Sequence, residues 1–374
     1  MTTEMTTEMT TQVQEKTRFS ELDFVRAIAI IAVIVIHVTS ITLTKIPTDD
    51  ITALLSLVLN QLSRFCVPAF LFVSGILAFH SFKKHTYVQV LKGKTNSLLI
   101  PYVIWTILGL LFFQMYSTNY KGIIMIFMTG NGPFYQLYYI PLLFQLFVVL
   151  PLMMKFISSK KFVVILSILT MLLFIVYEVI ILKAVLSEDF IGSTSALLQS
   201  TFVYWLIYFY LGIFAAQHYV KLLDFIKSKS TSMFVVVYLV SAVALVVDAY
   251  IGFITYKHVE LMNYFRVTVF IYSIASIALL IRLGMIYHWK MITHLYRNSF
   301  GIYLIHVVFI KILFLISSLF FSNVLYIVLS IVLTTLISYW LIEMIKWTPL
   351  SFLLIGKNNY YYIKKKNSNQ YTIK

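Results

Sequence analysis

Long apolar runs alternate with short polar connections along almost the whole chain. Ten of these runs have the roughly 17–25 residues that a helix needs to cross the hydrocarbon core of a bilayer. We expect the spans at residues 22–43, 58–79, 97–116, 134–154, 162–182, 201–218, 232–253, 264–283, 300–319 and 324–345. The pattern therefore predicts an all-α fold, a polytopic membrane bundle of about ten transmembrane helices.

The two ends of the chain lack this pattern. Residues 1–18 repeat Thr-Thr-Glu-Met and contain no apolar core, so we expect a disordered cytoplasmic tail and not a signal peptide. Residues 358–374 combine tyrosines with lysines, which is typical of a segment beside an anionic membrane surface. The connections between the runs are too short for a second domain, so residues 19–357 are expected to form one transmembrane domain.

Composition supports a membrane protein and argues against several other classes. Of the 374 residues, 60% are hydrophobic and 11% are charged, whereas about a quarter are charged in soluble domains. The formal net charge of +15 resides mainly in the connections, so it reflects topology and does not indicate nucleic-acid binding. The single cysteine, Cys66, lies in an apolar run, which excludes a disulfide framework and a cysteine-based zinc site. We expect no metal.

The distribution of lysine and arginine predicts the orientation in the membrane. With the N-terminal tail inside, the inner segments hold 21 of these residues and the outer segments hold four. Positive residues accumulate in cytoplasmic loops, so both termini are expected in the cytoplasm. The remaining four basic residues lie within predicted spans; they are Arg26, Arg64, Arg266 and Lys311.

Two polar residues interrupt the first apolar run. Arg26 and His37 are eleven residues apart, so on a helix they share one face and are separated by roughly 16 Å. Such groups usually face a bundle interior or a wet cavity and mark a functional path. Alternatively, Arg26 reaches the lipid headgroups and His37 hydrogen-bonds a neighbouring helix. Glu178 and Asp248, in later runs, are acidic residues that could pair with either one.

Later segments carry further candidate motifs. Residues 68–75 end in a Ser74-Gly75 pair, which offers a hydroxyl and lets another backbone approach closely. Residues 94–102 place Lys94 just before a Leu-Leu-Ile-Pro-Tyr helix start. Residues 299–306 place His306 in a predicted span, and histidine suits proton transfer because it ordinarily titrates near neutral pH.

In this order, the motifs resemble those of the bacterial membrane-bound acyltransferase 3 family. The family's first helix carries an arginine and a histidine spaced as Arg26 and His37 are, and its later signatures are similar to Pro68–Gly75 and Ser299–His306. The resemblance covers about residues 20–357 and is closest to the single-domain O-acyltransferase members. Residues 19–357 are therefore identified as an acyltransferase 3-like transmembrane domain.

Two segments depart from the family pattern. Lys94 matches the first of two arginines that the family places three residues apart, while Ser97 stands at the second, so one bidentate phosphate contact is lost. Residues 136–140, Gln-Leu-Tyr-Tyr-Ile, occupy the positions of a family His-Leu-Trp-Phe-Leu segment. Tyrosines at that place are also typical of an aromatic belt at the membrane interface.

The resemblance implies transfer of an acyl group, usually acetyl from acetyl-CoA, to a hydroxyl of an extracytoplasmic carbohydrate or cell-envelope polymer. His37 is then expected to act as general base or as transient acyl carrier. Arg26 and His306 are further candidates for the chemical step. Candidate ligands for the coenzyme phosphates are Lys92, Lys94 and Arg297, and candidate acceptor-binding residues are Arg64, Ser74 and Glu343.

The expected partners are membrane lipids, the polymer that accepts the acyl group and, in some arrangements, a separate extracytoplasmic transferase that completes the transfer. An alternative function is a transporter, in which the polar stripe lines a path for an exported glycan and no acyl bond changes. Cleavage of acetyl-CoA by the purified protein would distinguish the two.

Overall fold

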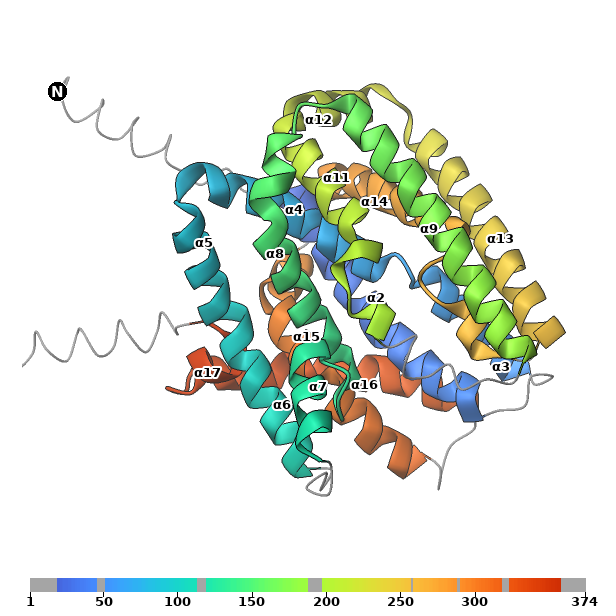
Figure 1. Ribbon diagram of the computed structural model, residues 1–374. Coiled ribbons are helices and arrows are strands. Elements are labelled where there is room, and N and C mark those ends of the chain that lie inside the picture. The colour runs from blue at the N-terminus through green and yellow to red at the C-terminus, as the bar shows by residue number, and fades with distance from the viewer. Residues whose placement is uncertain are drawn as a thin grey trace, which may run out of the picture.

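The computed structural model in Figure 1 is a bundle of helices, and no strand occurs in the part of the chain that it describes. The described residues are 19–45, 51–112, 119–187, 197–256, 258–287, 290–317 and 323–357. The predicted tails, 1–18 and 358–374, therefore lie outside the described residues. The all-α membrane fold predicted from the sequence is confirmed.

The helices follow the apolar runs closely. The α-helices of the first half are α2 (Ser20–Lys45), α3 (Ile51–Leu62), α4 (Cys66–Lys84), α5 (Tyr87–Lys94), α6 (Ile100–Phe112), α7 (Tyr120–Thr129), α8 (Tyr139–Lys155) and α9 (Lys160–Leu186). Those of the second half are α11 (Leu206–Gln217), α12 (Tyr219–Ser228), α13 (Thr231–Tyr256), α14 (Val267–Ile286), α15 (Lys290–Ser317), α16 (Asn323–Lys346) and α17 (Ser351–Ile355).

Eight helical segments among the described residues are long and apolar enough to span a bilayer by themselves. The predicted runs 134–154 and 201–218 differ from these. The first begins as a 3-10 helix, Tyr135–Tyr138, and continues as the 17-residue α8. The second contains the 12-residue α11, after which the chain bends by 91° into α12; counted as one span, this pair would be the ninth.

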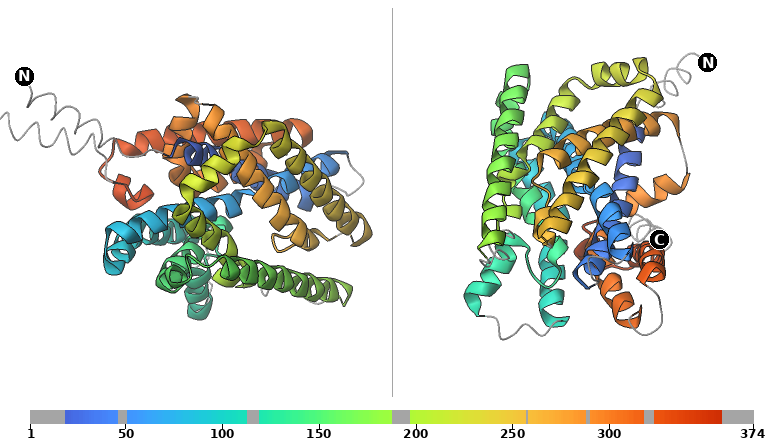
Figure 2. Two further views of the ribbon diagram at one scale, coloured as in Figure 1. Left: turned by 90° about the horizontal axis from the view of Figure 1, so that it is seen from above. Right: turned by 90° about the vertical axis from the view of Figure 1, so that its right-hand side faces the viewer.

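The first helix, α2, is the centre of the bundle. It packs against α3, α4, α14, α15 and α16, and Ala27, Ala29, Ile30 and Ile34 on it are fully buried. By contrast, α9 stands at the outside of the bundle (Figure 2). Only 22% of the most apolar stretch of α9 is buried, whereas 61% of the corresponding stretch of α2 is buried. The helix that carries Arg26 and His37 is therefore largely covered by other helices.

Two glycines bring α4 and α11 into backbone contact. A Cβ added to Gly75 would lie 2.1 Å from the carbonyl oxygen of Phe209, and one added to Gly212 would lie 2.0 Å from that of Phe72. Only residues without a side chain allow this approach, which is the usual role of small residues at helix interfaces in membranes. Within the Ser74-Gly75 pair, Gly75 therefore allows α4 to pack closely against α11.

Candidate active site

The polar positions of α2 face those of α15. The guanidinium of Arg26 donates to the Ser299 hydroxyl over 3.2 Å, and eleven residues further along α2 the His37 ring lies beside His306. On α15, Ser299, Tyr303 and His306 follow each other at intervals of four and three residues, which places them on one helix face. The polar face predicted on the first helix therefore packs against a polar face of α15.

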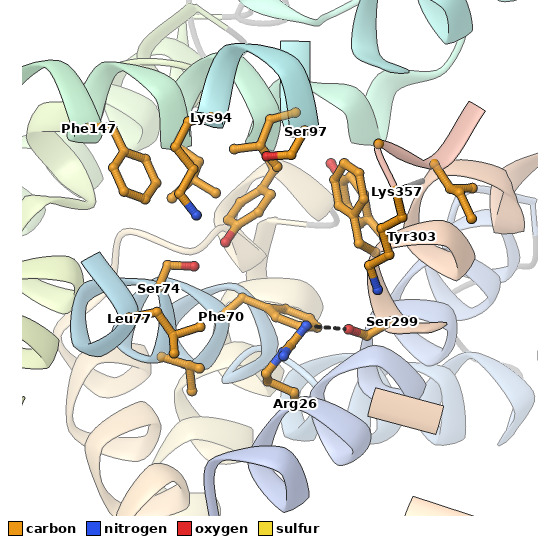
Figure 3. Close-up of a pocket in the computed structure, with 17 residues that line it drawn as sticks. Arg26, Phe70, Ser74, Leu77, Lys94, Ser97, Phe147, Ser299, Tyr303 and Lys357 are labelled. Atoms are coloured by element: carbon orange, nitrogen blue, oxygen red, sulfur yellow. Dashed lines mark hydrogen bonds between the residues drawn. The ribbon is translucent and has the colours of Figure 1, made fainter. Parts of the chain in front are cut away.

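The Arg26 end of this interface opens into a cavity of about 250 Å³, which we call the Arg26 cavity (Figure 3). Its cationic groups come from three separate parts of the chain, because Lys94 ends α5 and Lys357 follows α17. In Figure 3 the nitrogen atoms of all three point into the same space. Three residues with hydroxyl groups also line this cavity; they are Ser74, Tyr139 and Ser299.

Lys94 enters the cavity at a break in regular helix geometry. Residues Thr95–Leu99 form a π-helix between α5 and α6, and such bulges are frequent at functional sites. The ammonium of Lys94 lies 4.7 Å from the centroid of the Phe147 ring, a cation–π distance that supports a lysine among apolar neighbours. Ser97, the position where the family places a second arginine, also lines the cavity.

Lys357 reaches the cavity because of a left-handed turn after α17. Gly356 has φ +65°, and a Cβ there would meet the carbonyl oxygen of Ser97 at 2.1 Å. The chain can therefore pass directly against the π-helix and turn Lys357 inward. Its ammonium donates to the carbonyl oxygen of Arg297 over 2.7 Å. Lys357 remains exposed to solvent, but desolvation of its ammonium by the surrounding protein, together with the charge of Arg26, lowers the pKa of Lys357 to about 8.

The other end of the polar interface opens into a second cavity, of about 530 Å³, which we call the His37 cavity. Its polar lining residues include His37, Ser40, Arg64, Asn131, Gln136 and Gln199. The guanidinium of Arg64 donates to the Asn60 side chain over 2.9 Å and lies 4.6 Å from the Tyr264 ring centroid, while its buried Nε makes no hydrogen bond among the described residues. This cavity is suited to a polar ligand.

Two tyrosines form a common wall of the two cavities. Tyr139 and Tyr303 line both, and their ring centroids lie 5.7 Å apart in an edge-to-face arrangement. The Tyr303 hydroxyl donates to the backbone carbonyl of Gln136. The predicted interpretation of the tyrosines in residues 136–140 as an interfacial belt is wrong, because Tyr138 is buried and Tyr139 lies inside the bundle between the cavities.

The two histidine rings lie next to each other, close to Tyr303. The ring centroids of His37 and His306 are 5.1 Å apart, and that of Tyr303 is 6.0 Å from His306. Nδ1 of His306 lies 2.8 Å from the Tyr303 carbonyl oxygen, so we assign the proton to Nδ1. Nε2 then carries the lone pair, and it is buried without a hydrogen-bond partner among the described residues.

Not every residue predicted for the site lies in one of the two cavities. Lys92 is exposed on α5, two residues from Lys94 and therefore on a different helix face, and Arg297 contributes its backbone carbonyl to Lys357. Glu343 accepts from Asn298 over 2.6 Å and pairs with Lys346 at 2.8 Å. These contacts give Glu343 a role in joining α15 to the end of α16, and Glu343 is not among the lining residues of either cavity.

The acidic residues considered as partners of the first helix lie elsewhere. Asp248 pairs with Arg266 at 2.9 Å, and Arg266 also donates to Gln61. Glu178 interacts electrostatically with both members of that pair. Among the described contacts, Arg26 donates to Ser299, lies 5.7 Å from the centroid of the Tyr296 ring and interacts electrostatically with Asp23, three residues earlier on α2.

Comparison with known proteins adds independent evidence. The family model for an acyltransferase domain of the acyltransferase 3 type matches residues 19–343. The chain is 27% identical to a probable poly-β-1,6-N-acetyl-D-glucosamine export protein of Staphylococcus aureus strain MRSA252, with 81% of this chain and 85% of the relative covered. The corresponding Staphylococcus epidermidis protein is also 27% identical, with 81% and 84% covered. No solved structure gives a significant match.

Proposed function

The chain belongs to the acyltransferase 3 family of multi-pass bacterial membrane proteins, and on that premise we propose that it moves an acyl group from acyl-CoA, with acetyl-CoA as the donor, to a hydroxyl of an extracytoplasmic carbohydrate or cell-envelope polymer. The observation that supports this proposal best is the pair of cavities. One gathers three cations from separate elements, the other contains the histidine, and Tyr139 and Tyr303 are their common wall.

The Arg26 cavity has the chemistry for the donor. Coenzyme A carries phosphate groups, and Arg26, Lys94 and Lys357 offer charge-assisted hydrogen bonds to such anions. Arg26 can form a fork with two phosphate oxygens, whereas each lysine acts as a point charge. The excess of basic residues in the inner segments supports a cytoplasmic location for this cavity, where acyl-CoA is available.

The His37 cavity has the chemistry for the acceptor. In the proposed reaction the acceptor oxygen attacks the thioester carbonyl, its proton passes to the imidazole of His37, the carbon–sulfur bond breaks, and the coenzyme thiolate takes up a proton. His37 lines the cavity and can touch the acceptor, whereas His306 lies beside it with a lone pair on Nε2. We propose His37 as the catalytic residue, acting as general base or as transient acyl carrier, and His306 as its positioning residue.

In this proposal Arg64 binds the acceptor, since it lines the His37 cavity. Ser74, on α4, lines the Arg26 cavity and would contact the donor. The names of the staphylococcal relatives refer to poly-β-1,6-N-acetyl-D-glucosamine, a carbohydrate polymer, which supports a carbohydrate acceptor here. The same names favour a second candidate, export of such a polymer through the bundle without any change in an acyl bond.

The experiment that tests the proposal uses the purified full chain in lipid nanodiscs with acetyl-CoA labelled in the acetyl group. Addition of envelope polysaccharide should accelerate release of free coenzyme A and place the label on the polymer, and the His37→Gln protein should show neither. Polymer movement across proteoliposomes that contain the wild-type protein, with the thioester intact, would support the exporter and contradict the acyltransferase.

A further inference from the structure

A third cavity lies at the end of the bundle where α2 and α9 begin. It is an apolar groove of about 430 Å³, within the size range of small-molecule sites. Its apolar lining residues come from α4, α11, α12 and α14; they include Phe72, Phe214, Leu222, Ile277, Ala278 and Ile281. Its charged lining residues are Lys160, the first residue of α9, and Lys221 on α12. The groove shares no lining residue with the Arg26 or His37 cavity.

α12 forms one side of this groove and has the features of a helix that lies along a membrane surface. α12 turns 91° away from α11, so it runs across the direction of the helix that precedes it. Its sequence, Tyr-Val-Lys-Leu-Leu-Asp-Phe-Ile-Lys-Ser, buries Ile226 while leaving Lys221 and Lys227 exposed. Apolar residues on one face and charged residues on the other are typical of interfacial helices.

Contacts at both ends hold α12 in this position. The Tyr219 hydroxyl donates to the carboxylate of Glu21 at the start of α2. At the other end, Arg282 of α14 donates to the carbonyl oxygen of Ile226 over 3.4 Å and to the Thr231 hydroxyl over 3.1 Å. These contacts join α12 to α2 and α14 beside the groove.

We propose that this groove binds an anionic phospholipid, with one acyl chain among the apolar residues and the phosphate against Lys160 and Lys221. Lysines reach lipid headgroups while their methylene stems cover apolar surface. Among the described residues no carboxylate lines the groove, so its charge complements an anionic headgroup and would gain little from a zwitterionic one. The predicted orientation places this end at the cytoplasmic leaflet, which is rich in anionic lipid.

Native mass spectrometry of the full chain, released from detergent micelles, tests the headgroup preference. Dioleoylphosphatidylglycerol and dioleoylphosphatidylcholine are titrated separately. We expect the wild-type protein to bind the anionic lipid about tenfold more tightly. A double substitution of Lys160→Gln and Lys221→Gln should abolish the preference. A matched pair, Lys161→Gln and Lys227→Gln, removes the same charge from exposed positions that do not line the groove and should keep it.

A second variant tests the acyl-chain position without changing charge. Ala278→Phe places a ring in the groove and should weaken binding of both lipids while the headgroup preference remains. Equal affinity of the wild-type protein for the two lipids would overturn the proposal, as would an equal loss in the groove and control pairs. Unchanged lipid binding by Ala278→Phe would overturn the assignment of the acyl chain. None of these results depends on acyl transfer, so they are independent of the proposed function.

Discussion

The imidazole rings of His37 on α2 and His306 on α15 lie with their centroids 5.1 Å apart and their planes inclined by 35°. They come from positions 269 residues apart in the sequence, but they are not equivalent. His37 lines the His37 cavity, which is the larger of the two. His306 is fully buried, and its Nδ1 donates to the Tyr303 carbonyl oxygen. One histidine can therefore touch a substrate, and the other can only orient or polarise its neighbour.

This difference predicts unequal effects of two matched substitutions. His37→Gln keeps a polar side chain but removes proton exchange near neutral pH, so acyl transfer should fall by about 10²- to 10⁴-fold. His306→Gln should lower kcat less and leave KM for the donor unchanged, because His306 lines neither cavity. The measurement is acyl transfer to envelope polymer by membranes that contain equal amounts of each protein. Near-normal turnover of the His37 variant would contradict this mechanism.

A second prediction compares two lysines on one short helix. Lys94 lines the Arg26 cavity, but Lys92, two residues earlier, is exposed outside it. Lys94→Ala should raise KM for acetyl-CoA by about tenfold or more, since it removes a charged phosphate ligand, and the effect should shrink at high salt. Lys92→Ala is the matched control and should behave like the wild-type protein. Equal effects of the two would indicate a diffuse surface attraction and no defined phosphate contact.

The third prediction concerns pH. The pKa of Lys357 is lowered to about 8, so its charge is present below pH 8 and is lost above it. A bound phosphate would raise that pKa, so affinity for coenzyme A should fall as the pH rises through 8 toward 9.5. Lys357→Arg keeps its charge throughout this range and should remove the decline. Binding is measured by calorimetry on the protein in nanodiscs, and a decline of the same size in the arginine variant would exclude Lys357 as its source.

The sequence predicted the fold because each spanning helix is encoded locally, by the length and apolarity of one run. It also predicted that Arg26 and His37 share a face, which follows from helix geometry alone. The short helices were less predictable. Apolarity continues from residue 201 to 218, but the end of α11 and its 91° bend into α12 depend on tertiary contacts such as Tyr219 with Glu21.

The candidate site was only partly predictable for the same reason. Lys357 looked like one more inner basic residue, and its position depends on the close approach of Gly356 to Ser97, 259 residues earlier. Tyr139 resembled an interfacial aromatic residue, because an isolated sequence does not reveal that another helix covers it. Lys92 and Lys94 could not be separated by composition, whereas the helix face on which each lies separates them in the structure.

A fourth prediction concerns topology, with both termini in the cytoplasm. In a Cys66→Ser background, a cysteine that replaces Lys121 should react with a membrane-impermeant maleimide on intact cells, because this lysine lies in a predicted outer segment. A cysteine that replaces Lys227 should react only after permeabilisation. The reverse pattern would place the Arg26 cavity on the outer side and remove its access to cytoplasmic acyl-CoA.

The final prediction concerns the contact between Gly75 and Gly212. α4 carries Phe70 and Ser74 into the Arg26 cavity, so the position of that wall depends on how closely α4 approaches α11. A methyl group at either glycine would overlap a backbone carbonyl oxygen, which cannot move without displacing its helix. Gly75→Ala and Gly212→Ala should each destabilise the protein by about 1–3 kcal/mol or more.

Gly93 on α5 provides the matched control for these variants. A Cβ added there meets no atom within 4 Å, so Gly93→Ala should be neutral or slightly stabilising, as expected for alanine in a helix. Thermal unfolding in detergent, followed by fluorescence-detected size exclusion, compares the three variants with the wild-type protein. If Gly75→Ala unfolds at the wild-type temperature but loses donor affinity, the contact sets the shape of the cavity more than the stability of the bundle. Wild-type behaviour in both measurements would contradict the close approach of α4 and α11.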